Sequence, residues 1–262
     1  MIRTLEELAL NALPALQTLL LDGWVLRLAD GYTRRANSVN PLYPAHGDNL
    51  ARLRACESVY AAHGLPVLFK LTPVAQPAGL DAFLAAQGYT LEARTSVQTV
   101  RLPEAGQSDA AGFELQAAGF ELQAAGLELQ AAPTARWQAA FQALAGIPPR
   151  HHPTLAQMLG HLRASAGFAL LTEDGQPAAC GLGVVQAGYL GLFDIVTAPH
   201  ARRRGLGRRL VARLLHWGRA AGAHTAYLQV MQDNAPALSL YAGLGFRELY
   251  AYWYRVQPAP TL

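Results

Sequence analysis

The stretch FDIVTAPHARRRGLGRRLVARLLHWGRAAG, residues 193–222, decides the fold. An apolar run from Leu192 to Thr197 predicts a buried strand. After Pro199 and a short basic segment, apolar residues recur at helical spacing and predict a helix from Gly205 to Ala221: Leu206, Leu210, Val211, Leu214 and Leu215. The basic segment Arg202–Gly207 therefore lies in a tight loop at a helix N-terminus.

That loop has the properties of a phosphate site. A helix N-terminus presents unpaired backbone N–H groups and the positive end of the helix dipole. Gly205 and Gly207 let the backbone approach a ligand closely, and the clustered arginines supply charge-assisted hydrogen bonds. No GxxxxGK[ST] motif occurs, and Leu210 stands where a dinucleotide fingerprint needs a third glycine. A solvated basic helix start is the remaining alternative.

Composition indicates a soluble globular protein with room for two domains. The chain has 262 residues, a net charge of +3, and 52% hydrophobic against 15% charged residues. Cys56 and Cys180 lie far apart and lack ligand spacing, so neither a disulfide framework nor a zinc site is predicted. Residues 1–24 predict an amphipathic helix and no signal peptide, because Glu6 and Glu7 are acidic and Pro14 interrupts the apolar run. We expect a cytoplasmic protein with no membrane partner.

The order of elements predicts an α/β fold with a mixed sheet. Residues 126–256 alternate strands and helices, which is typical of an α/β layer fold. Residues 1–102 predict a smaller α+β unit with a hairpin at the turn Ala29–Gly31, helices over 48–63 and 78–87, and strands over 65–71 and 89–102. We predict a first domain at 1–104, a linker at 105–125 and a second domain at 126–262.

The linker carries a short repeat. GFELQAA occurs at 112–118 and at 119–125, and GLELQAA follows at 126–132. The seven-residue period suggests a coiled coil, but each copy contains a glycine and only two sizeable apolar side chains. We favour duplication of the first strand of the second domain, with the third copy as the working strand.

A larger repeat relates the two halves of the chain. Both halves show the order strand, helix, Gly-aromatic and strand. Alignment of Gly88-Tyr89 with Gly245-Phe246 superposes four further pairs: Leu71 on Leu228, Ala78 on Ala235, Phe83 on Leu240 and Ala85 on Ala242. The sequence therefore predicts two copies of one fold.

Three separated segments of the second half resemble the GNAT superfamily of acetyl-CoA-dependent N-acetyltransferases. Arg202–Gly207 is similar to the family's Q/R-x-x-G-x-G/A motif. TAPHA at 197–201 and DNAPALSLYAGLGF at 233–246 look like its strand-end and Asn-to-Tyr segments, and the likeness covers about residues 126–256. The resemblance implies two GNAT-like domains in tandem, a mixed sheet that splays beside its fourth strand, and transfer of an acetyl or related acyl group from acetyl-CoA to a primary amine in a ternary complex.

The resemblance also assigns residues to the donor. The pantetheine arm would lie against the backbone of Ile195, Val196 and Thr197, and the pyrophosphate would bind the amides of Arg203 to Arg208. Asn234 would contact the cofactor near the pantetheine, and Tyr241 would lie beside the sulfur and protonate the departing thiolate. The complete donor set is Ile195, Val196, Thr197, Arg202, Arg203, Arg204, Gly205, Leu206, Gly207, Arg208, Asn234 and Tyr241. For Tyr241, a half-buried aromatic on a helix face is the alternative.

The acceptor amine must lose a proton before it attacks. Holding a primary amine of pKa 10.4 neutral at pH 7 costs about 4.6 kcal/mol, so a base helps. Asp194 is the one carboxylate in the strand beside the expected reaction centre, and strand alternation places it on a face with Leu192 and Val196. Whether it is the base or a structural or positioning carboxylate stays open.

Three histidines lie in loops near the expected site. His200 is more simply a loop residue than a catalyst. His151 and His152 fall in a loop that often covers the acceptor in the GNAT family, and a surface loop is the alternative.

The first half lacks the donor motifs. In the alignment Leu84 replaces Tyr241, Pro77 replaces Asn234, and no RxxGxG precedes its helix, so we expect one acetyl-CoA site per chain. Its polar run could line the acceptor pocket or make structural hydrogen bonds: Arg34, Arg35, Asn37, Ser38 and Asn40.

Two functions from other classes compete with acetyl transfer. A non-catalytic acyl-CoA sensor would keep the phosphate loop without needing Tyr241. A basic nucleic-acid-binding module would use the arginines, but no base-stacking aromatics interleave them. We expect an amine acceptor, small molecule or peptide, with no metal and no nucleic acid.

Overall fold

The computed structural model describes residues 1–103 and 126–258 and divides the chain into two compact units. Unit 1 contains Met1–Ser96, Pro153–Leu162 and the chain from Tyr250 onward. Unit 2 contains Val97–His152 and Arg163–Leu249. Unit 1 thus takes in two segments from the second half of the sequence. The predicted linker, with its first two heptapeptides, lies outside the described residues.

Unit 1 is a mixed sheet with helices. Its strands are hydrogen-bonded in the order β1-β2-β3-β4-β11-β5, and β3 and β4 are parallel. In chain order its elements are α1 (Ile2–Ala12), β1 (Gln17–Leu21), β2 (Trp24–Leu28), η1 (Arg34–Ala36), β3 (Val39–Pro41), α2 (Asn49–Ala62), β4 (Leu68–Leu71), α3 (Leu80–Ala86), β5 (Thr90–Arg101), α6 (His152–His161) and β11 (Arg247–Val256). β5 ends in unit 2 and β11 begins there.

Both faces of the unit 1 sheet are covered. One face forms an apolar core with α2 and α3, in which Trp24, Phe69 and Tyr60 are buried. The other face is polar, because strand alternation turns Lys70 away from that core. Lys70 donates to the buried Glu6 of α1 at 2.5 Å, and Glu6 also accepts from the Tyr250 hydroxyl at 2.6 Å. The Lys70 charge is therefore buried together with its partner Glu6, which is also bound by Tyr250.

The start of unit 1 differs from the predicted helix. α1 ends at Ala12, just before Pro14, and Gln17–Leu21 form β1. The two-residue turn Asp22–Gly23 joins β1 to β2 with φ values of +40° and +82°. The predicted pairing of the strands on either side of Ala29–Gly31 is confirmed, since β2 and β3 are antiparallel, but their connection is longer and contains η1.

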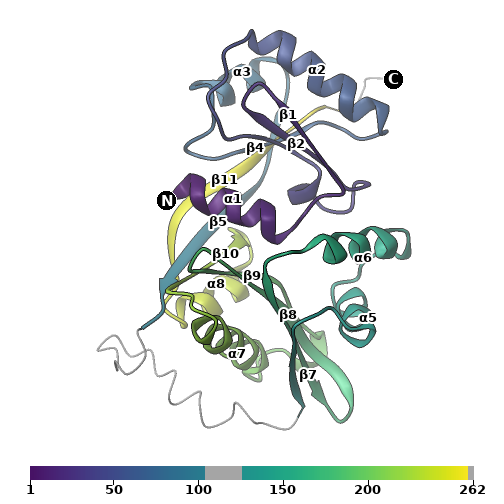
Figure 1. The fold of residues 1–262 in the computed structure, drawn as a ribbon, viewed down its shortest axis with the longest axis vertical. Helices are drawn as coiled ribbons and strands as arrows, with labels where there is room; N and C mark the ends of the chain where they lie inside the picture. Colours follow the sequence, from purple (N-terminus) through teal and green to yellow (C-terminus); the bar gives the residue numbers. More distant parts are fainter. Residues whose placement is uncertain (104–125, 259–262) are drawn as a thin grey trace. The chain divides into compact units, whose positions relative to one another are not determined.

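Unit 2 is also built around mixed β-strands, with helices on both faces. Its strands are hydrogen-bonded in the order β5-β10-β9-β8-β7-β6, and β9 and β10 are parallel. Figure 1 shows α5 and α7 on opposite sides of β7 and β8. Its remaining elements are β6 (Leu127–Gln130), α5 (Ala135–Leu144), η3 (Pro149–His151), β7 (Ser165–Glu173), β8 (Gln176–Gln186), β9 (Tyr189–Thr197), η4 (Pro199–Ala201), α7 (Leu206–Ala220), β10 (Thr225–Met231) and α8 (Ala235–Ala242). The predicted α/β mixed sheet is confirmed.

The third heptapeptide is the first strand after the linker, as predicted. β6 pairs antiparallel with β7, and Leu127 and Leu129 pack against the unit 2 core. Gly126 has φ +92°, and a Cβ there would lie 2.3 Å from the Thr172 carbonyl oxygen. The glycine of the repeat is therefore required where the chain enters this strand.

The long helix α7 completes the unit 2 core. Leu206, Leu210, Leu214 and Leu215 are buried against β7, β8 and β9, which confirms the predicted apolar face. None of the helices in residues 1–103 and 126–258 combines the length and apolar character that a membrane crossing needs.

Candidate acetyl-CoA site

A β-bulge interrupts β9 at Asp194. Leu182 of β8 faces Phe193 and Cys180 faces Val196, so the single residue between them, Gly181, faces both Asp194 and Ile195. Asp194 has φ +54°, a left-handed conformation that few non-glycine residues adopt. A bulge of this kind bends its strand and re-aims the side chains around it.

The bulge changes the predicted direction of the side chains. Leu192 and Ile195, three residues apart, both pack against the core beneath α7, so simple alternation fails at this point. A Cβ at Gly181 would lie 2.5 Å from Ile195 Cδ1, so only glycine leaves room for Ile195 there. Asp194 is half-buried, and its carboxylate adds to the burial that raises the pKa of Cys180. The expectation that Asp194 shares a face with Leu192 and Val196 does not hold.

The sheet opens just beyond the same point. β9 and β10 pair in parallel from Tyr189 with Thr225 to Leu192 with Leu228, and the ladder then ends. Both strands nevertheless continue, to Thr197 and to Met231. The β9 edge from Phe193 to Thr197 thus lies outside the β9–β10 ladder of the described chain. This is the splayed sheet that the resemblance implied.

The basic loop between η4 and α7 forms a cradle of backbone N–H groups. Arg203 and Gly205, on either side of Arg204, have φ values of +60° and +77°, and such left-handed residues close together in a loop can turn neighbouring amides toward one point. In the described part of the chain no hydrogen bond is made by the backbone N–H of Arg203, Arg204 or Gly205. A Cβ at Gly205 would meet no atom within 4 Å. We call Arg203–Arg208 the phosphate cradle, and its open side suits an anion.

Two arginine side chains of this loop have partners in the protein. Arg202 Nε donates to the Thr197 carbonyl oxygen at 3.4 Å. The Arg204 guanidinium makes two parallel hydrogen bonds, of 2.8 Å and 3.0 Å, to the carboxylate of Glu173 at the end of β7. Arg204 therefore offers the cradle its backbone amide while its guanidinium is paired. Sequence reasoning missed Glu173, because no motif in the chain singles it out.

Helix α8 packs against the start of α7. A Cβ at Gly207 would lie 3.3 Å from Thr197 Oγ1 and 3.4 Å from Leu240 Cδ2, so the glycine permits this approach. Tyr241 on α8 is 7% exposed, and its ring lies edge-to-face with Phe246. Burial raises the pKa of the Tyr241 phenol to about 12. A phenol with that pKa keeps its proton at neutral pH and can donate it.

Asn234 caps helix α8. Its side-chain oxygen accepts from the Ala237 amide at 3.2 Å, a common N-cap arrangement. The side chain is exposed at the same end of β10 where the ladder with β9 has opened. Its amide nitrogen remains a donor that a ligand could use.

The other residues singled out from the sequence lie in structural contacts. His152 contacts the Ile147 carbonyl oxygen at 2.9 Å, His151 accepts from Arg150 Nε at 3.2 Å, and His200 is exposed in η4. In unit 1 the Asn37 side chain accepts from the amides of Ala29 and Gly31, which favours the structural interpretation of that residue.

The remaining members of that polar run differ among themselves. Arg34 pairs with Glu92 at 2.6 Å on the surface, and Ser38 and Asn40 are buried. Asn40 donates to the Ser38 carbonyl oxygen at 3.0 Å.

Comparison with known proteins assigns the family. A family model described as "Probable histone acetyltransferase Rv0428c C-terminal" matches residues 1–255. The N-acetyltransferase YobR of Bacillus subtilis is 30% identical over 257 residues, which are 98% of each chain. The chain belongs to this family of GNAT N-acetyltransferases.

Other GNAT proteins share the fold or part of the sequence. A GCN5-related N-acetyltransferase from Kribbella flavida superposes with a TM-score of 0.68 at 20% identity, over 99% of this chain and 96% of that one. A tandem GNAT protein from the clavulanic acid biosynthesis pathway gives a TM-score of 0.58 at 17% identity, over 90% and 79%. The Escherichia coli ribosomal protein bS18-alanine N-acetyltransferase is 38% identical over 78 residues, or 30% of this chain and 53% of that protein.

Family membership confirms the predicted activity. The chain is an acyl-CoA-dependent N-acetyltransferase, and its fold is that of the GNAT proteins, which include tandem forms. GNAT acetyltransferases use acetyl-CoA and act on amines. The open β9 edge and the phosphate cradle are the features of unit 2 that fit such a donor.

Proposed function

We propose that unit 2 binds acetyl-CoA along the open β9 edge and in the phosphate cradle, and transfers its acetyl group directly to a primary amine. The observation that carries this proposal is that the β9–β10 ladder ends close to a loop whose backbone N–H groups make no hydrogen bond. The β9–β10 ladder ends at Leu192, and the free amides of Arg203–Gly205 follow a few residues after the end of β9. An extended arm that ends in a pyrophosphate matches that arrangement.

Different residues of unit 2 would bind different parts of the donor. Backbone groups of Ile195, Val196 and Thr197 would hold the pantetheine arm. The amides of residues 203–208, Arg204 included, would hold the pyrophosphate, together with arginine side chains of the loop other than that of Arg204. Asn234 would contact the donor near the pantetheine. A backbone N–H of the bulged strand would stabilise the oxyanion that forms on the thioester carbonyl.

Tyr241 is the proposed acid. The neutral amine attacks the thioester carbon, the carbon–sulfur bond breaks, and the sulfur takes the phenolic proton as it leaves. The attacking nitrogen releases one proton to solvent as it becomes an amide, and the Tyr241 phenolate takes one proton back from solvent. Holding both reactants on one protein supplies much of the rate enhancement.

Asp194 is the proposed base for the acceptor. Asp194 belongs to the part of β9 that lies beyond the end of the β9–β10 ladder, and there its carboxylate would take the proton that an acceptor ammonium group has to lose. The acceptor class is a small-molecule or peptide primary amine. The match to the bS18-alanine N-acetyltransferase covers 30% of this chain, so an N-terminal alanine peptide is one probe among several and not an assignment.

The experiment uses two glycines that flank α7. Gly205 and Gly222 have φ values of +77° and +90°, and a Cβ at either meets nothing within 4 Å, so valine strains the backbone equally at both. We expect Gly205→Val to weaken acetyl-CoA binding at least ~10-fold in calorimetric titration because it distorts the cradle. Gly222→Val should bind as the wild type does. Equal binding by all three proteins would remove the cradle from the donor site.

A further inference from the structure

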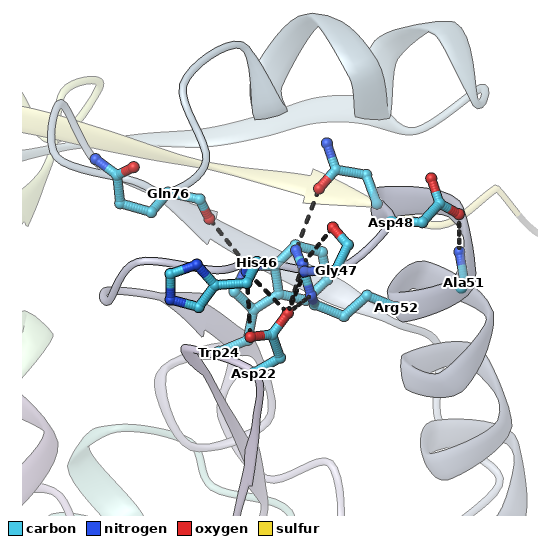
Figure 2. Close-up of polar contacts among 9 residues, drawn as sticks. Asp22, Trp24, His46, Gly47, Asp48, Ala51, Arg52 and Gln76 are labelled. Carbon is cyan, nitrogen blue, oxygen red and sulfur yellow. Dashed lines mark hydrogen bonds and ion pairs between the residues drawn. The ribbon is translucent and has the colours of Figure 1, made fainter.

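In unit 1, an acidic side chain of the protein itself fills the loop that precedes the helix. Figure 2 shows the Asp22 carboxylate directed at the backbone of His46 and Gly47. It accepts from the Gly47 amide at 2.9 Å and from the His46 amide at 3.1 Å. Arg52 of α2 adds a hydrogen bond of 2.7 Å and stacks on Trp24. The His46 and Gly47 amides of this loop are thus occupied by a carboxylate of the protein.

Unit 2 has the same elements in the same order. In each unit an antiparallel hairpin is followed by a strand, a loop and a long helix: β1, β2, β3 and α2 in unit 1, and β7, β8, β9 and α7 in unit 2. Both hairpins close on an Asp-Gly turn with positive φ, Asp22–Gly23 and Asp174–Gly175. The hairpin of unit 2 also carries an acidic residue that reaches the loop, namely Glu173.

The two carboxylates are bound differently. Asp22 lies on the loop amides, whereas both oxygens of Glu173 lie on the Arg204 guanidinium, at 2.8 Å and 3.0 Å. A bidentate pair fixes a carboxylate in position as well as neutralising it. In the described chain the backbone N–H groups of Arg203, Arg204 and Gly205 make no hydrogen bond.

We propose that Arg204 is a positioning residue that holds the Glu173 carboxylate away from the phosphate cradle and thereby keeps the cradle open for pyrophosphate. The inference rests on the proposed donor site. It gives Arg204 a role other than direct phosphate binding: without the guanidinium, Glu173 competes with the ligand for the amides, as Asp22 does in unit 1, and repels the pyrophosphate charge.

The test is a double-mutant cycle on acetyl-CoA affinity, measured by calorimetric titration of the full chain. We expect Arg204→Ala to raise the acetyl-CoA Kd ~10-fold, and Glu173→Gln alone to change it less than ~2-fold. The double variant should return to within ~3-fold of the wild type, because the competing charge has gone. Arg204→Lys should give a Kd between those of the wild type and Arg204→Ala, because lysine neutralises Glu173 but cannot hold both carboxylate oxygens at once.

A matched pair controls for the loss of a surface ion pair. Arg136 and Glu128 of unit 2 form a pair of 2.5 Å with exposure similar to that of Arg204 and Glu173. Arg136→Ala and Glu128→Gln should leave the acetyl-CoA Kd unchanged. Thermal unfolding of every variant checks that the fold is intact.

Each other outcome overturns the inference in a recognisable way. If Arg204→Ala weakens binding equally with and without the Glu173→Gln substitution, Arg204 binds the phosphate directly. If Arg204→Ala binds acetyl-CoA with the wild-type Kd, Glu173 does not compete with the ligand for the cradle amides. If the wild type binds no acetyl-CoA, the donor site itself is wrong and the inference falls with it.

Discussion

At the scale of single residues, Tyr241 carries the clearest chemical prediction. Burial raises its pKa to about 12, so the phenol stays protonated from pH 6 to 10 and can serve as an acid throughout. We expect Tyr241→Phe to lower kcat about 100-fold, with the KM for acetyl-CoA nearly unchanged, because the ring packing on Phe246 is kept.

Thiol release from acetyl-CoA, followed with spermidine, a lysine ester and an N-terminal alanine peptide as acceptors, measures this effect. The wild-type kcat should not fall between pH 8 and 10 through loss of the Tyr241 proton. An unchanged kcat in the Phe variant would show that another group protonates the thiolate.

Asp194 makes a second prediction at this scale. Asn tolerates a positive φ, so Asp194→Asn keeps the bulge while removing the basic group. We expect kcat/KM for the amine to fall about 100-fold. The Kd for acetyl-CoA is the control and should not change. A variant with the wild-type kcat/KM for the amine would assign Asp194 a structural role.

Residue-level prediction from the sequence succeeded where a motif fixes local geometry. The position of the Gly205 loop at the N-terminus of α7 was predicted from its neighbours in the chain and is confirmed. The direction of the Asp194 side chain could not be predicted in this way, because the bulge depends on Gly181 in the adjacent strand. Glu173 and Asp22 were missed for the same reason, since their partners lie 31 and 24–30 positions away in the sequence.

At the scale of elements, the Asp22 carboxylate in the β1–β2 turn of unit 1 makes the stability of the fold depend on pH. Hydrogen bonds from the Gly47 and His46 amides, with Arg52, hold the pKa of Asp22 below its ordinary value of 3.8. A carboxyl whose pKa is lowered by folding stabilises the fold above its unfolded pKa and loses that effect as pH falls toward its folded pKa. Asp22→Asn should therefore unfold at a lower temperature than the wild type at pH 7, and the difference should shrink below about pH 4.

Thermal unfolding followed from pH 7 to pH 3 measures this difference. Asp174→Asn, at the matching turn position of the β7–β8 hairpin, controls for replacing the turn aspartate itself. A constant gap between Asp22→Asn and the wild type at every pH would mean that the Asp22 charge does not support the loop.

Elements with strong periodicity or clear caps were predictable. Helix α2 begins after its cap Asp48, and α7 follows its apolar spacing. Strand β1 was assigned to the first helix because its residues are as apolar as those of a helix face, and only the pairing with β2 decides between the two.

At the scale of the whole molecule, the sequence predicted the duplication but not how the chain is shared between the units. Gly88 and Gly245, aligned from the sequence, both have φ +83° and end equivalent helices. Strand β11 follows α8 of unit 2, yet its last residues pair with β4 in unit 1. Such pairing is decided by tertiary contacts that local sequence does not encode.

The two units differ in the loop that precedes the long helix, which is where the donor would bind in unit 2. The loop of unit 2 leaves its amides free, whereas that of unit 1 is filled by Asp22. The most direct test is the stoichiometry of acetyl-CoA binding to the wild-type chain by calorimetric titration. We predict that one molecule of acetyl-CoA binds per chain and that Gly205→Val abolishes or strongly weakens this binding. Two molecules per chain, or one that is indifferent to Gly205→Val, would contradict it.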